Sequence, residues 1–148
     1  MNLHPAFISE KVSLLERCCR EHGIPLTVQR RVIMETLAGR NDHPTADQIY
    51  DAVAARLPGI SRTTVYRVLD AFVALGVSQK INSPEAKAHF DADTSRHHHV
   101  RCTVCGAVAD VHDEVLNALK LPEETASGFV LLDYSINFVG TCPTCCSH

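Results

Sequence analysis

Residues 96–110, RHHHVRCTVCGAVAD, place three consecutive histidines and one Cys-x-x-Cys pair close together. A second Cys-x-x-Cys pair, Cys142 and Cys145, lies near the end of the sequence. Imidazole nitrogens and thiolate sulfurs are the ligands that zinc and related transition metals prefer. The stretch therefore predicts metal binding, and the next question is whether its histidines and cysteines serve one site or two.

Two Cys-x-x-Cys pairs supply the four thiolates of a closed, tetrahedral zinc site. We expect a structural Zn²⁺ on Cys102, Cys105, Cys142 and Cys145. Cys146 follows directly and is an alternative to Cys145 as the fourth ligand. Two unrelated pairs of reduced cysteines are the other interpretation.

The segment between the two pairs is longer than in a simple zinc ribbon, so it must fold in a way that returns the second pair to the first. Residues 106–111 and 128–140 have strand-like sequences, and residues 113–120 predict a short helix between them. Cys18 and Cys19 are adjacent in a helical pattern, so their side chains point in different directions. We expect these two cysteines to pack rather than bind metal.

A zinc ion held by four thiolates has no open position for the histidines, which therefore need a site of their own. If the histidine run is a strand, His97 and His99 point to one face and His98 to the other. Asp91 and Asp110 are candidate oxygen ligands nearby in the sequence. Imidazoles with carboxylates and no thiolate suit Fe(II) or Mn(II), with zinc as an alternative. The competing interpretation is a solvated histidine run.

Helical periodicity occupies the first half of the chain, at residues 7–21, 28–37, 46–55 and 62–75. Thr27, Thr45 and Ser61 are the expected N-caps of the last three helices, and Thr45 with Gln48 predicts a capping box. Residues 77–93 then predict a two-stranded hairpin with a turn at residues 83–85. Three helices followed by such a hairpin form a winged helix.

The helix expected at residues 62–75 has the pattern of a DNA-recognition helix. Its apolar residues would face a core, and the opposite face would expose the residues that we expect to bind DNA: Arg62, Thr63, Thr64, Tyr66 and Arg67. That face begins at the helix N-terminus, which contacts base edges when a recognition helix enters the major groove. Arginine pairs with guanine, and threonine and tyrosine contact thymine or phosphate. A solvated amphipathic helix with no ligand is the alternative.

Charge and composition restrict the class of protein. The formal net charge of the 148 residues is −3, with ten Lys and Arg against nine Asp and Glu in residues 1–85 and four against eight in residues 86–148. A nearly neutral first half can present a local basic face, and acidic residues near the histidines suit cation binding. The N-terminal sequence has no secretory pattern and no apolar run is long enough to span a membrane. We expect a cytoplasmic protein without a membrane partner, whose cysteines are reduced.

The order of the motifs LTVQRRVIMETL, HPTADQIYDAV, ISRTTVYRVLDAFVALG, AHFDAD, HHHVRCTVCGAVADV and CPTCC resembles the ferric uptake regulator (Fur) family over about residues 10–146. The resemblance implies an α+β protein with a winged-helix DNA-binding domain at residues 1–90, a hinge at 91–95 and a small α/β dimerisation domain at 96–148. It also implies a homodimer that binds double-stranded operator DNA and represses transcription when metal is bound.

The same resemblance implies a structural Zn²⁺ on the four cysteines of the two pairs and a regulatory Fe²⁺ or Mn²⁺ at the hinge. The regulatory ligands would be His43, Asp91, His97, His99 and Asp110. Asp91, where the iron-sensing branch usually has Glu, is similar to the peroxide-sensing PerR branch, in which His43 and His97 would be the residues oxidised. The alternative function is an iron- or zinc-uptake repressor that responds to metal only. A further metal site of some relatives would fall on Arg96, His98, Asn117 and Tyr134, and is expected to be absent.

Two enzymatic interpretations fit the sequence less well, and we expect no enzyme activity. A metallohydrolase would need an open metal position and a carboxylate base, and no H-E-x-x-H pattern occurs. A thiol oxidoreductase would place a Cys-x-x-Cys pair at a helix N-terminus, whereas Cys105 is followed by Gly106 and a strand-like run.

Overall fold

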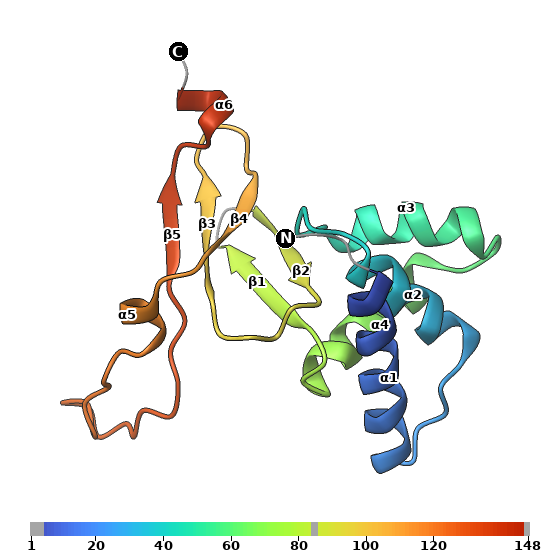
Figure 1. The fold of residues 1–148 in the computed structure, drawn as a ribbon, viewed down its shortest axis with the longest axis horizontal. Helices are drawn as coiled ribbons and strands as arrows, with labels where there is room; N and C mark the ends of the chain where they lie inside the picture. The colour runs from blue at the N-terminus through green and yellow to red at the C-terminus, as the bar shows by residue number, and fades with distance from the viewer. Residues whose placement is uncertain (1–4, 84–85, 147–148) are drawn as a thin grey trace. The chain divides into compact units, whose positions relative to one another are not determined.

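The computed structural model describes residues 5–83 and 86–146, which form two compact units that divide between Thr94 and Ser95. The first unit contains the helices α1 (Pro5–Glu21), α2 (Val28–Ala38), α3 (Ala46–Arg56) and α4 (Arg62–Ala74), followed by the strands β1 (Gln79–Ser83) and β2 (Ala86–Asp91) (Figure 1). The second contains β3 (His98–Cys102), β4 (Val108–Val111), α5 (Glu114–Asn117), β5 (Asn137–Gly140) and α6 (Pro143–Cys146). The predicted α+β class is confirmed.

Residues with hydroxyl side chains cap the N-termini of three of the four long helices, as the sequence predicts. The Thr27 and Ser61 side chains accept hydrogen bonds from backbone N–H groups in the first turns of α2 and α4. Thr45 and Gln48 form a complete capping box at α3, in which each side chain accepts from the other residue's backbone N–H. These bonds satisfy N–H groups that have no partner within a helix, so they determine where each helix starts.

The core of the first unit forms from one face of each helix. On α4, Val65, Leu69 and Phe72 are fully buried, which confirms the predicted division between its core face and its exposed face. The core also includes these buried side chains from the other three helices: Leu15, Ile33, Met34, Leu37, Ile49 and Val53. Gly76 ends α4 with a positive φ of 76°, a conformation that glycine adopts without steric cost. The packing of the buried face against the core therefore holds α4 in place, with its opposite face exposed.

The hairpin β1–β2 completes the winged-helix arrangement. The strands pair antiparallel, with Gln79 opposite Asp91 and Lys80 opposite Phe90. The Phe90 N–H also donates to the Pro44 carbonyl at 2.8 Å, which holds β2 against the segment that precedes α3. Residues 84 and 85 of the predicted turn lie outside the described residues.

The second unit is a small sheet with β3 at its centre. β4 pairs antiparallel on one side of β3 and β5 pairs parallel on the other. The predicted strand at residues 128–140 is shorter than expected, because only Asn137–Gly140 has a strand partner within the described residues, apart from an isolated bridge at Val130. Several apolar residues before β5 are exposed: Phe129, Val130 and Leu132, the last at 91%. No helix in the described part of the chain is long and apolar enough to cross a membrane.

Leu69 tests whether α4 depends on its buried face. Leu69→Ala should lower the free energy of unfolding by about 2–5 kcal/mol, because it leaves a cavity among side chains that have no exposed surface. Arg67→Ala, on the exposed face of the same helix, should change it by less than about 0.5 kcal/mol. Urea unfolding followed by circular dichroism measures both, and equal midpoints for the two variants would contradict this packing.

Candidate metal centres

Four cysteines meet at one end of the second unit. Because β3 and β5 run parallel with Cys102 opposite Gly140, the residues that follow the two strands lie at the same end of the sheet. Cys102 and Cys105 flank the turn after β3, and Cys142 and Cys145 lie just before and within α6. All four Sγ atoms lie within 4.8 Å of one another, and those of Cys105 and Cys142 are 3.7 Å apart. A tetrahedron with Zn–S bonds of about 2.3 Å has sulfurs about 3.8 Å apart, so the cluster could hold zinc.

Backbone N–H groups favour a thiolate in this cluster. The N–H groups of Cys105, Cys142 and Val104 face the Cys102 sulfur and lower the pKa of Cys102 to about 6. A hydrogen bond to the Cys142 sulfur, burial and the neighbouring sulfurs of Cys102 and Cys105 raise the pKa of Cys145 to about 12. Negative charge on one sulfur therefore opposes ionisation of the next. A divalent cation is what would allow all four to be thiolates, so the donor set fits such an ion.

The five ligands expected for a regulatory metal divide between the two units, and His43 and Asp91 belong to the first. His43 has a positive φ of 51°, which is uncommon for a residue other than glycine and often marks a functional position. The His89 ring and the His43 carbonyl share a hydrogen bond of 2.5 Å, which fixes the residue against β2. His43 Nε2 lies 3.3 Å from Asp91 Oδ2, and the Asp93 N–H donates to Asp91 Oδ1 at 2.9 Å. The carboxylate is thus oriented by a backbone hydrogen bond.

His97, His99 and Asp110 form a second group within the sheet unit. His99 pairs with Asp110 across β3 and β4. Asp110 Oδ1 lies 3.2 Å from His97 Nε2 and 3.5 Å from His99 Nε2. His97 Nδ1 donates to the Ser95 carbonyl at 2.7 Å, which makes Nε2 the basic nitrogen of a neutral ring. A basic nitrogen that faces a carboxylate oxygen requires a proton or a metal cation between them, so this group fits a cation.

His98 projects from the opposite face of β3, which confirms the predicted alternation. Its Nδ1 accepts from the Ile136 N–H at 3.1 Å, so its Nε2 carries the proton that is donated to the Leu116 carbonyl at 3.1 Å. The His98 ring also stacks on Tyr134. His98 therefore binds α5 and the segment before β5 to the central strand.

His112 is a neighbour of the acidic group that sequence reasoning missed. Its Nε2 lies 3.9 Å from Asp110 Oδ2 and its ring stacks on His97. Asp110 and His112 are two residues apart at the end of β4, so strand alternation places them on one face, and that spacing was the available signal. His112 is half exposed, which suits an outer position better than a ligand position.

The five residues predicted to contact DNA all lie at the start of α4, but their surroundings differ. Thr63 and Arg67 are exposed, and Arg67 has no hydrogen-bond or ionic partner within the described residues. The Thr64 hydroxyl bonds to Ser61 at the helix start. Arg62 and Tyr66 both contact the carboxylate of Asp47 on α3, an interaction that the sequence analysis did not anticipate.

The sequence model of the ferric uptake regulator family matches residues 21–139. The chain belongs to this family. Among curated relatives, the peroxide-responsive repressor PerR of Staphylococcus epidermidis is 31% identical over 126 residues, covering 85% of this chain and 84% of that protein. The manganese-bound ferric uptake regulator of Pseudomonas aeruginosa is 27% identical with a TM-score of 0.67, over 84% of this chain and 95% of that one.

The Helicobacter pylori ferric uptake regulator, described as having three functional metal-binding sites, has a TM-score of 0.73 over 93% of both chains at 16% identity, a likeness of fold. Its membership of the family makes this protein a metal-responsive regulator rather than an enzyme. Its relatives include both peroxide-responsive and metal-binding members.

Cysteine substitutions test the zinc ligands of this Fur-family protein. We expect one chelator-resistant Zn²⁺ per chain, which Cys102→Ser should lose together with the fold of the sheet unit, because structural zinc contributes on the order of 10 kcal/mol in small domains. Cys146→Ser is the matched control and should retain the metal. Plasma mass spectrometry after dialysis against EDTA measures both. If Cys145→Ser retains zinc and Cys146→Ser loses it, the fourth ligand is Cys146 instead of Cys145.

Proposed function

We propose that this Fur-family protein is a metal-dependent transcriptional repressor that binds operator DNA as a homodimer. In this proposal, Fe(II) or Mn(II) bound by His43, Asp91, His97, His99 and Asp110 makes the repressor sensitive to peroxide. The observation that supports it most directly is Asp110 Oδ1 facing the Nε2 atoms of two histidines, one of which has its proton on the other nitrogen. The Cys cluster is proposed to hold a separate structural Zn²⁺.

The two metal sites use ligands of different chemistry. Thiolates are soft ligands that suit zinc, whereas imidazoles and carboxylates also suit Fe(II) and Mn(II). A zinc ion with four thiolates leaves no coordination position for a signal, so we assign sensing to the histidines and aspartates. In this assignment, the zinc on the cysteines maintains the fold, and the metal on the histidines and aspartates binds or leaves according to the signal.

DNA recognition is proposed for the exposed face of α4, with Arg62, Thr63, Thr64, Tyr66 and Arg67. The buried face supports this proposal, because it holds the helix while its N-terminal residues remain accessible at the surface. Arg67 is exposed and has no competing partner in the described chain, so it is the residue most readily available to a base edge. The hydroxyl of Thr64, in contrast, already serves the helix start.

A homodimer is proposed on the basis of the apolar surface of the second unit. Most of the large exposed apolar side chains belong to it: Val104, Val115, Leu119, Phe129, Val130, Leu132 and Val139. Monomeric proteins rarely expose this much apolar surface in one small unit. A second copy that covers these side chains would remove them from water, and it would place two α4 helices on one DNA duplex.

Coupling between metal and DNA follows if both ligands favour the same arrangement of the two units. The metal would bind ligands from both units, and the dimer would bind DNA through the first unit only. Each ligand must then raise the affinity for the other by the same factor, with a typical coupling of about 1–3 kcal/mol. The metal thus controls repression without contacting DNA.

Arg67 tests the DNA proposal. A preferred duplex is first selected from a randomised library with the Mn(II)-loaded protein. Arg67→Ala should weaken binding to it by about 1–3 kcal/mol and relax the base preference, because a bidentate contact to a base is lost. Lys120→Ala removes the same charge from the second unit and should have little effect. Fluorescence anisotropy measures both, and unchanged affinity in the Arg67 variant would assign base contacts to another element.

Peroxide sensing has a defined chemical product. Bound Fe(II) would supply the redox chemistry that cleaves the O–O bond, and a ligand imidazole would be the net two-electron donor. One H₂O₂ and one imidazole then give one oxo-imidazole and one water, with no net change in the oxidation state of the iron. An oxidised ring is a weaker ligand, so the metal and then the DNA would be released. Mn(II) does not readily support this reaction, so the Mn(II) form should bind DNA and resist peroxide.

Mass spectrometry of peptides after brief peroxide treatment tests this mechanism. The Fe(II) form should gain one oxygen atom on His43 or His97, and the Mn(II) form should gain none. His98, which lies in the same stretch but faces the other side of β3, is an internal control and should remain unmodified. Absence of histidine oxidation with DNA binding retained would favour an iron- or zinc-uptake repressor that responds to metal only.

A further inference from the structure

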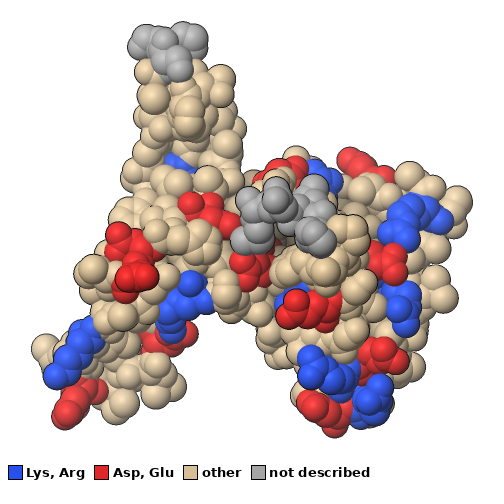
Figure 2. Space-filling view, viewed as in Figure 1, with Lys and Arg blue, Asp and Glu red and all other residues tan. Residues whose placement is uncertain are grey.

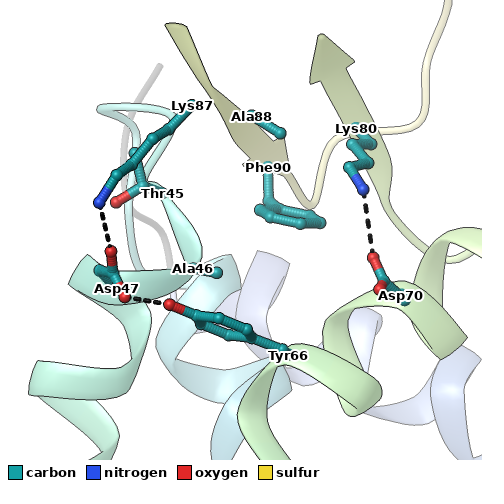
Figure 3. Close-up of a pocket in the computed structure, with 9 residues that line it drawn as sticks. All are labelled: Thr45, Ala46, Asp47, Tyr66, Asp70, Lys80, Lys87, Ala88 and Phe90. Atoms are coloured by element: carbon teal, nitrogen blue, oxygen red, sulfur yellow. Dashed lines mark hydrogen bonds and ion pairs between the residues drawn. The ribbon is translucent and has the colours of Figure 1, made fainter. Parts of the chain in front are cut away.

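One carboxylate, that of Asp47, is contacted by two groups from the surface of α4 proposed to bind DNA and by a lysine of the hairpin β1–β2. It accepts hydrogen bonds from Arg62 at 2.9 Å, from Lys87 at 2.6 Å and from the Tyr66 hydroxyl. Arg62 and Tyr66 belong to α4 and Lys87 to β2, whereas Asp47 lies in the first turn of α3. Figure 3 shows Lys87 and Tyr66 converging on Asp47 from two sides. The recognition helix α4 and the hairpin β1–β2, which is the wing, are thus both bound to α3.

A similar pairing lies on the other side of the wing. Lys80 of β1 contacts Asp70 of α4 at 3.3 Å, and Phe90 lies between the two ion pairs in Figure 3. A cavity of about 300 Å³ opens among these side chains. In Figure 2, Lys and Arg atoms lie beside Asp and Glu atoms over the helical unit on the face in view. Positive and negative side chains are therefore interspersed on this face, and Arg62, Lys87 and Lys80 each contact a carboxylate.

We propose that Asp47 is a specificity-determining residue that occupies, in the free protein, the place that a DNA phosphate would take beside Arg62 and Lys87. This inference rests on the proposed function. A phosphate that approaches these cations must displace the carboxylate and is repelled by it. Non-specific binding consists almost entirely of phosphate contacts, so it depends on Arg62 and Lys87 more than a complex that also has base contacts does. Asp47 therefore lowers non-specific binding more than specific binding.

The chemistry of the cluster supports this role over a role in stability. The Lys87 ammonium and the Tyr66 hydroxyl lower the pKa of Asp47 to about 2, so the carboxylate is charged at every pH at which the protein would bind DNA. The side chain of Lys87 is 74% exposed and that of Arg62 is 54% exposed. Ion pairs this exposed contribute little to folding, but both cations remain accessible to phosphate. Their pairing therefore matters mainly when DNA approaches.

Asp47→Asn is the direct test, because asparagine keeps the shape and one acceptor oxygen but removes the charge. Binding is measured over a series of salt concentrations with two probes, the duplex selected by the Mn(II)-loaded wild type and a scrambled duplex of the same composition. Asp47→Asn should raise affinity for the scrambled duplex about three- to tenfold, with a salt dependence steeper by about one to two units in log–log slope, because two cations become available. The ratio of selected to scrambled affinity should fall.

Asp51→Asn is the matched control. Asp51 lies one turn further along α3 on the same side as Asp47, carries the same charge and is exposed. It has no hydrogen bond or ion pair with α4 or with the described residues of the hairpin β1–β2. It should leave both affinities and the salt slope unchanged. If the two variants have equal effects, the change in net charge alone explains the change in affinity, and the proposal is overturned. Weaker binding of both duplexes by Asp47→Asn would also overturn it, because Asp47 would then only hold Arg62 and Tyr66 in position.

Lys87→Gln gives a second, independent measurement. If Asp47 masks Lys87, the substitution should change the salt slope little in the wild type and by about one unit in the Asp47→Asn background. Equal effects in both backgrounds would overturn the masking. If the Mn(II)-loaded wild type selects no sequence, the proposed function itself is contradicted. If the wild type selects a sequence and Asp47→Asn leaves its selectivity unchanged, only the role of Asp47 is contradicted.

Discussion

The register of the central strand β3 determines both candidate metal centres. His99 lies opposite Asp110 on one neighbour, and Cys102 lies opposite Gly140 on the other, two residues before Cys142. A shift of one residue would turn the His97 and His99 side chains to the other face of the sheet, because side chains alternate along a strand. The same shift would move Cys102 away from its partner sulfurs. The pairing of β3 with its two neighbours therefore positions residues of both candidate metal centres.

A structural zinc would stabilise the register on which the other site depends. The cysteines join the ends of β3 and β5, whose hydrogen-bonded ladder covers only a few residues and leaves apolar surface exposed. Such a small unit has little core of its own. His98 adds a second connection from the opposite face, through its hydrogen bonds to Leu116 and Ile136. His97 and His99, two of the proposed regulatory ligands, therefore lie at the start of a strand that His98 holds on one face and that a zinc ion would hold at its other end.

Local physical chemistry explains why parts of this protein were predictable. Hydroxyl caps, helical periodicity and strand alternation act over a few residues, so Thr45, Leu69 and His98 were assigned correctly from their neighbours in sequence. The predicted length of β5 was wrong. A strand extends only as far as its hydrogen-bonded partner, and apolar composition does not identify that partner. The contacts of Asp47 were missed because they join residues 15 to 40 positions apart.

The spacing of the ligands explains how a small ion could govern the arrangement of two folded units. Asp91 ends β2 in the first unit and His97 precedes β3 in the second, with residues 92–96 between them. Such a segment spans at most about 20 Å when extended, so the two ligand groups stay at high effective concentration for each other. A metal bound at both ends of the segment would restrict its backbone freedom, and its loss would restore that freedom. Because His43 is also held to β2 through His89, the restriction would extend to β2. Through the contact of Lys87 with Asp47 it would reach α3, which contacts the helix proposed to bind DNA.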